Sequence, residues 1–115
     1  IFQQLCPSQA IQIGNLMFTS GQLPIDPATG KIPEGPISIR AHQAIKNLSA
    51  IVVEAGACLD DIVKTTVFLT DIADFQEVNK VYAEYFKSPY PARSAFQVSA
   101  LPLGADIEIE AIVQI

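Results

Sequence analysis

The residue best suited to chemistry in this sequence is Arg93, which stands in the stretch Pro91-Ala92-Arg93-Ser94. It is one of only two arginines, and every charged side chain after it is acidic. An arginine at the start of a predicted strand, isolated in the sequence from other cations, is suited to bidentate binding of a small carboxylate. The same spacing fits an ion pair with a glutamate on a neighbouring strand. The residue types leave both interpretations open.

Two carboxylates follow in the last predicted strand. Glu108 and Glu110 are two residues apart, so they share one face of that strand. They form either a polar row facing solvent or a site at which one of them orients a water molecule beside Arg93. Asn79, near the start of the second predicted helix, is either a surface amide or a hydrogen-bond donor to a ligand.

Several familiar mechanisms need residues that this chain does not have. His42 is the only histidine, so any Ser-His or Cys-His nucleophile pair within one chain would have to use it. Its place beside the apolar positions of the first helix predicts a solvated surface residue. Cys6 and Cys58 are isolated, which predicts neither a disulfide nor a zinc site, and phosphate-binding glycine motifs are absent. We therefore expect no metal and no cofactor.

The composition predicts one domain over residues 1–115 that associates with copies of itself. Half of the residues are hydrophobic and only 17% are charged, which is more apolar surface than a monomer of 115 residues can hide. The net charge of −5 and the scattered basic residues argue against nucleic acid as a partner. We expect no membrane span and no signal peptide, and a cytoplasmic location, or a mitochondrial one in a eukaryotic host.

The periodicity of the apolar residues predicts strands alternating with helices. In chain order we expect a strand over 16–20, a reversal at 26–30 that suggests a hairpin, a helix from about 38 to 55, a strand over 62–69, a helix over about 74–86, and two strands around 101–104, the last covering 106–115. Asp74 and Glu77 resemble a capping box at the start of the second helix. The order predicts an α+β fold, a mixed sheet covered on one face by two helices.

The motifs together closely resemble the RidA family, also called YjgF or endoribonuclease L-PSP. They occur in a familiar order over about residues 8–115 and comprise Thr19-Ser20-Gly21-Gln22, Asp74-Phe75-x-x-Val78-Asn79, Pro91-Ala92-Arg93-Ser94 and Leu101-Pro102-x-Gly104-Ala105-x-Ile107-Glu108-Ile109-Glu110-Ala111. The resemblance implies a chorismate-mutase-like fold and a homotrimer whose sheets form a central barrel, with three sites between subunits. It also implies hydrolysis of 2-imino acids, such as 2-iminopropanoate and 2-iminobutanoate, to 2-oxo acids and ammonia without a cofactor.

The same resemblance implies roles for five residues. Arg93 would bind the substrate carboxylate and Glu108 would position the water, while Ser20 and Asn79 would line the cleft and the backbone carbonyl of Ala95 would face the imine. One position differs, because Pro7 stands where the family usually has a tyrosine that closes over the substrate.

Two other functions compete with imine hydrolysis. A non-enzymatic module could hold a 2-oxo acid at Arg93 as a regulatory ligand, and the absence of the tyrosine at Pro7 favours this alternative. The endoribonuclease or translation-inhibitor activity reported for some relatives fits less well, because the chain is acidic and has one histidine.

Overall fold

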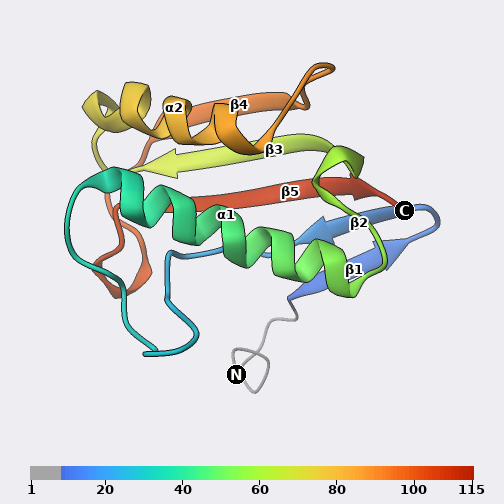
Figure 1. Cartoon of the computed structure of the whole chain (residues 1–115), viewed down its shortest axis with the longest axis horizontal. Helices are drawn as coiled ribbons and strands as arrows, with labels where there is room; N and C mark the ends of the chain where they lie inside the picture. Colours follow the sequence, from blue (N-terminus) through green and yellow to red (C-terminus); the bar gives the residue numbers. More distant parts are fainter. Residues whose placement is uncertain (1–8) are drawn as a thin grey trace.

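The computed structural model describes residues 9–115 and has two layers, a five-stranded sheet and two helices (Figure 1). The strands are β1 (Ala10–Ile13), β2 (Leu16–Thr19), β3 (Ile62–Leu69), β4 (Ala92–Gln97) and β5 (Ile107–Gln114), in the spatial order β1-β2-β5-β3-β4. Only β3 and β4 are parallel, as expected for two strands joined through a helix. Helices α1 (Ile37–Glu54) and α2 (Phe75–Tyr85) cover the same face of the sheet. The predicted α+β fold, a mixed sheet with two helices on one face, is confirmed.

The position predicted for the first hairpin was wrong. The hairpin joins β1 to β2 through Gly14 and Asn15, ahead of the predicted reversal, and Gly14 has a positive φ of 60° that glycine adopts without strain. A Gly-Asn pair between apolar residues is a known hairpin signal that the sequence-based prediction missed. The reversal at 26–30 exists, since Asp26 accepts backbone hydrogen bonds from Thr29 and Gly30. No strand follows it, and the two prolines after it interrupt the chain there.

The start of α2 also differs from the predicted capping box. The Asp74 side chain caps nothing, and the capping carboxylate belongs to Asp71, which accepts a hydrogen bond of 2.9 Å from the backbone of Ala73. A 3-10 turn over Ile72–Asp74 precedes the helix, so the chain needs its cap three residues earlier than the sequence pattern suggested.

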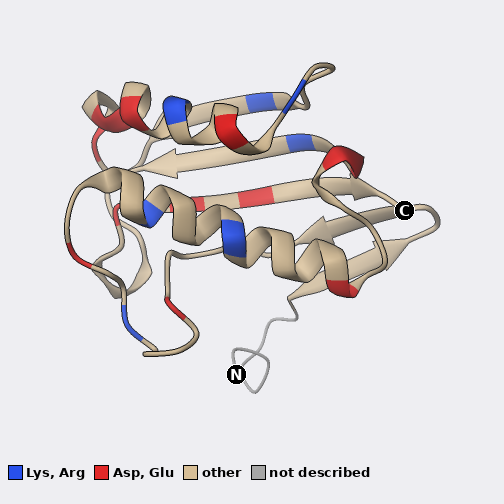
Figure 2. Cartoon of the chain, viewed as in Figure 1, with Lys and Arg blue, Asp and Glu red and all other residues tan. Residues whose placement is uncertain are grey.

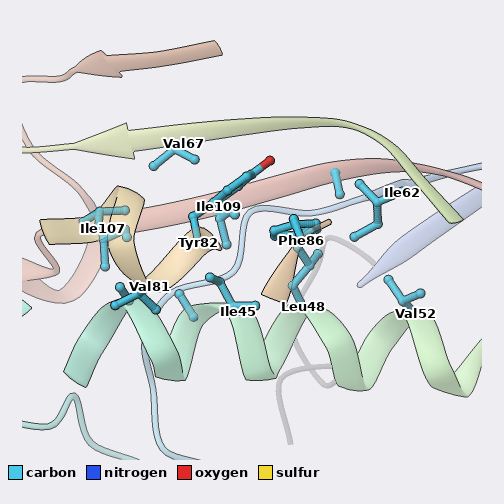
Figure 3. Packing of buried hydrophobic residues seen from close by; sticks show 14 of the residues in the cluster. Ile45, Leu48, Val52, Ile62, Val67, Val81, Tyr82, Phe86, Ile107 and Ile109 are labelled. Atoms are coloured by element: carbon cyan, nitrogen blue, oxygen red, sulfur yellow. The ribbon is translucent and has the colours of Figure 1, made fainter. Parts of the chain in front are cut away.

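The core lies between the helices and the sheet face they cover. Figure 3 shows aliphatic side chains of α1 pointing at those of the sheet. The helix contributes Ile45, Leu48 and Val52, and the sheet contributes Val67, Ile107 and Ile109, each at most 2% exposed. Burying one such side chain contributes about 1.5–3 kcal/mol. Every second residue is buried throughout β5 and from Thr65 onward in β3, as the predicted period of two requires. At the start of β3 a register shift between Ile62 and Lys64 buries Ile62 and leaves Val63 exposed.

No helix from residues 9–115 covers the opposite face of the sheet, which presents apolar side chains. Cross-strand pairing and alternation place Ile11, Ile13, Phe18 and Phe96 on it, with exposed fractions of 40–67%. This exposed apolar area is what a surface that binds further chains presents. Within the described residues no helix is both long and apolar enough to cross a membrane.

Candidate active site

Arg93 lies on β4 with its side chain on the helix-covered side of the sheet, beneath α2. Its backbone pairs with Thr65 of β3, whose side chain is fully buried under the helices. The guanidinium Nη1 donates a hydrogen bond of 2.6 Å to Oδ1 of Asn79. The guanidinium carbon lies 4.8 Å from the ring centroid of Tyr82 and 5.1 Å from that of Phe75, within the range of cation–π attraction. One side of α2 thus contacts the guanidinium through an amide and two rings.

Arg93 has no carboxylate partner among residues 9–115. The alternative of an ion pair with a glutamate on a neighbouring strand is wrong, because β4 is an edge strand whose neighbour is β3. Glu108 and Glu110 lie on β5, one strand further in, on the face without helices. A guanidinium held by neutral groups alone retains its charge for an external anion.

Hollows lie on both sides of the Arg93 side chain. One is lined by Asn79, Tyr82, Ala83, Tyr90 and Pro91, and the other by Ile72, Ala73, Phe75, Gln76 and Ala95. Apolar walls around a single cation are typical of a site for a small organic anion. Arg93, Asn79 and Ala95, three of the five residues singled out from the sequence, therefore lie together, and we call them the arginine half-site.

Glu108 lies on the face without helices, with its carboxyl against the backbone of Gly21. A Cβ placed on Gly21 would overlap the Glu108 carboxyl group, so only glycine allows this approach. Partial burial raises the pKa of Glu108, and the nearby charge of Glu110 raises it further. A carboxylate with a raised pKa accepts a proton more readily than an ordinary glutamate, as a group that activates water must.

Ser20 belongs to the same segment as Gly21. The backbone of Gln22 exchanges two hydrogen bonds with Ile109, of 2.7 and 3.1 Å, which fixes this segment beside β5 next to Glu108. Ser20 also donates its backbone N–H to the carbonyl of Gln9 at 2.8 Å. Ser20, Gly21 and Glu108 form a second group, which we call the glutamate half-site.

The structure does not bring the two half-sites together within one chain. Arg93 shares a face with Thr65, and the partner of Thr65 on β5 is the buried Ala111. Glu108 is three residues from Ala111, so its side chain projects from the other face. A layer of backbone separates the two charges, and one reaction can use both only if they come from different subunits.

Sequence reasoning missed Phe75, Tyr82 and Gly21 as parts of the site. The periodicity of the second helix places both rings on its apolar face, yet positions 75, 79 and 82 also have the spacing of one helical stripe and could have been linked to Arg93. The role of Gly21 has no local signal, because the Glu108 carboxyl that it accommodates is distant in the sequence.

The prediction that His42 is a solvated surface residue was also wrong. Its ring is half-buried between the helices, with Nδ1 2.8 Å from the Tyr85 hydroxyl and the two rings in an edge contact. The helix periodicity could not show this, because α2 packs beside α1 and covers a side that is polar in the sequence.

Pro7 and Cys6 lie outside the described residues, and Cys58 is an exposed free thiol.

Positive charges are dispersed over the molecule. Figure 2 shows Lys and Arg on both helices, on β3 and β4 and in the loops, with acidic residues between them. Phosphate binding requires cations gathered on one surface, so this distribution does not favour a nucleic-acid interface.

Comparison with known proteins decides the family, because the family model described as endoribonuclease L-PSP matches residues 7–115. The chain belongs to the endoribonuclease L-PSP family. A relative from Sinorhizobium fredii, RutC family protein y4sK, is 53% identical over 108 residues, which cover 94% of this chain and 86% of that protein. The resemblance stated from the sequence motifs is confirmed.

Two further relatives carry informative names. The human 2-iminobutanoate/2-iminopropanoate deaminase is 48% identical over 105 residues, covering 91% of this chain and 77% of that protein. The crystal structure of E. coli TdcF with bound serine has a TM-score of 0.90 and 43% identity, and it covers 96% of this L-PSP family chain and 90% of that one.

In this L-PSP family chain, Gly21→Ala is expected to lower kcat/KM for the imine hydrolysis proposed below. The decrease should be about 10- to 100-fold, because the new methyl group displaces the Glu108 carboxyl. Steady-state kinetics on the folded variant measure the effect. Gly30→Ala is the control: Gly30 has open space but a φ of 73°, so this change costs about 1 kcal/mol of stability and leaves kcat/KM unchanged. Equal kinetics for Gly21→Ala and wild type would contradict the role given to Gly21.

Glu108→Gln is expected to stabilise the protein at neutral pH. Because burial and Glu110 raise the Glu108 pKa in the folded chain, folding is favoured while this carboxyl is protonated and loses that contribution as the pH rises through the pKa. Thermal unfolding should therefore give a higher Tm for the variant at pH 7, with the difference vanishing at about pH 4 and below. Glu34→Gln, at an exposed loop position, is the control. A Tm difference that does not change with pH would refute the assignment.

Proposed function

We propose that this chain hydrolyses 2-imino acids, such as 2-iminopropanoate and 2-iminobutanoate, to 2-oxo acids and ammonia. The observation that carries the proposal is Arg93, a guanidinium that donates a hydrogen bond to Asn79 and lies over two rings. It has no carboxylate partner in the described chain and is next to a hollow. The name of the 48% identical human relative supports the same chemistry. A family relative whose crystal structure holds serine supports a small amino-acid-like ligand.

The proposed reaction adds water to the imine carbon and expels ammonia. Arg93 would bind the substrate carboxylate through two parallel N–H donors and so fix the adjacent imine carbon. Glu108 would orient a water molecule and accept its proton as the C–O bond forms. That proton then goes to the nitrogen, which gives an intermediate with a hydroxyl and an amino group on the same carbon. Transfer of the hydroxyl proton to the amino group, again through Glu108, lets the C–N bond break, and ammonia leaves as the C=O bond of the 2-oxo acid forms. Positioning, charge complementarity and these proton transfers would supply the catalysis, without a covalent intermediate.

We further propose that the protein acts as a homotrimer with sites between subunits. The apolar face without helices supports association, because Ile11, Ile13, Phe18 and Phe96 are otherwise exposed. The half-sites on opposite faces support a shared site, with Arg93, Asn79 and Ala95 from one subunit and Ser20 and Glu108 from the next. A ring of three such contacts closes the assembly. Native mass spectrometry and light scattering test the stoichiometry.

The test of the reaction generates the imine in place. A serine/threonine dehydratase releases 2-iminopropanoate or 2-iminobutanoate, and formation of the 2-oxo acid is followed with and without this protein. We expect the protein to accelerate imine decay above the rate in water. Saturable binding of 2-oxobutanoate without acceleration would instead establish the carboxylate-binding regulator, and RNA cleavage that survives rigorous purification would point to the ribonuclease.

A further inference from the structure

Binding a carboxylate with both oxygens requires a guanidinium whose plane is fixed. Arg93 is exposed and has a long, flexible side chain. Without further contacts the guanidinium would adopt several orientations. A single hydrogen bond to Asn79 fixes one nitrogen but leaves rotation about the N–O line. Something further must hold the guanidinium plane in the unliganded protein.

The rings of Phe75 and Tyr82 are placed to do this. Both belong to α2, seven residues apart, with Asn79 between them on the same helical stripe. The Arg93 guanidinium carbon lies over both rings, at 5.1 Å and 4.8 Å from their centroids. A ring face attracts a cation and also restricts the plane of a guanidinium that lies on it.

Tyr82 is itself fixed from two sides. Its ring stacks on Phe86 with centroids 4.3 Å apart, and its hydroxyl lies 2.8 Å from the hydroxyl of Thr65, which is fully buried in β3. The Tyr82 side chain is only 5% exposed and has little freedom to move with the arginine. Thr65 is also the backbone partner of Arg93, so one strand position orients both the arginine and the ring against which it packs.

We propose that Phe75 and Tyr82 are positioning residues that hold Arg93 ready for the substrate carboxylate, with Thr65 fixing the Tyr82 ring. They act through Arg93 and do not touch the reacting atoms. The proposal rests on the proposed function for its consequence in catalysis, whereas the contact itself can be measured without any substrate.

The kinetic test compares changes that remove a ring with one that keeps it. Tyr82→Leu and Phe75→Leu are each expected to raise KM about 3- to 10-fold, with a smaller change in kcat, because the carboxylate contact is made in the ground state as well. Tyr82→Phe keeps the ring but loses the hydroxyl that Thr65 holds, so its KM should rise much less than that of Tyr82→Leu. Tyr85→Leu is the matched control, because this ring of α2 contacts His42 and not Arg93.

The outcomes separate a positioning role from a structural one. A variant that merely unfolds in part loses active protein, which lowers kcat and leaves KM unchanged, and that result for both leucine variants overturns the proposal. A rise in KM for Tyr82→Phe equal to that for Tyr82→Leu overturns the assignment to the ring.

A spectroscopic measurement keeps the inference independent of the reaction. Protons of the Arg93 side chain that lie over ring faces are shielded, so their NMR signals should be shifted upfield in the substrate-free protein. The shift should diminish in Phe75→Leu and Tyr82→Leu but persist in Tyr85→Leu. If the wild type shows no shielding, the rings do not hold Arg93 and the inference is wrong. If it shows shielding but hydrolyses no imine, the positioning role stands and the proposed function fails.

Discussion

Arg93→Ala is expected to lower kcat/KM for 2-iminobutanoate about 100-fold or more while the protein stays folded. The substrate carboxylate would lose a charge-assisted bidentate partner, a loss worth about 2–5 kcal/mol where the partner charge is desolvated. Since Arg93 makes no ion pair within the described chain, its removal leaves no unpaired protein carboxylate behind. The dehydratase-coupled assay measures the ratio, and circular dichroism confirms the fold.

Two controls isolate the guanidinium. Arg93→Lys keeps the charge but loses the planar pair of donors, so its kcat/KM should fall between those of the wild type and Arg93→Ala. Arg40→Ala removes the other arginine, which binds Asp106 at 2.9 Å and the carbonyls of Pro33 and Gly35. That variant should lose thermal stability and retain its KM. An Arg93→Ala protein with wild-type kinetics would remove Arg93 from the site.

Long periodic segments could be predicted because one face of each is buried. The alternation in β3 and β5 and the apolar stripe of α1 appear in the structure within a few residues of their predicted limits. The first hairpin could not be placed in the same way, because β1 is four residues long and mostly exposed and so has no buried stripe to reveal it. The local Gly14-Asn15 pair was the available signal.

The site was only partly predictable, because its geometry depends on pairing between distant segments. The sequence indicated Arg93 and Glu108 as a cation and a carboxylate, and alternation along β5 showed which residues accompany Glu108. It could not show that the two side chains leave opposite faces of the sheet, since that depends on the register of β4 with β3. Half-burial of His42 likewise depends on how α2 lies beside α1.

Mixed trimers of Arg93→Ala and Glu108→Gln subunits are expected to recover activity that neither variant has alone. If each site takes its arginine half-site from one subunit and its glutamate half-site from the next, a trimer with both variants contains one site with both residues intact. Trimers purified through two different tags, one on each variant, should therefore show about one third of the wild-type kcat. The coupled assay on the doubly purified trimers measures it.

The control pairs two variants of the same half-site. A mixed trimer of Arg93→Ala and Asn79→Ala subunits contains no site in which both residues are intact, because Asn79 binds Arg93 within its own chain. The activity of this mixed trimer should not exceed that of a trimer made only of Asn79→Ala subunits. Recovery in the first mixture but not in the second would place the catalytic carboxylate and the substrate-binding arginine on different subunits. Failure of the first mixture, in trimers of confirmed composition, would mean that Glu108 does not complete the site of Arg93, so another group would have to deliver the water.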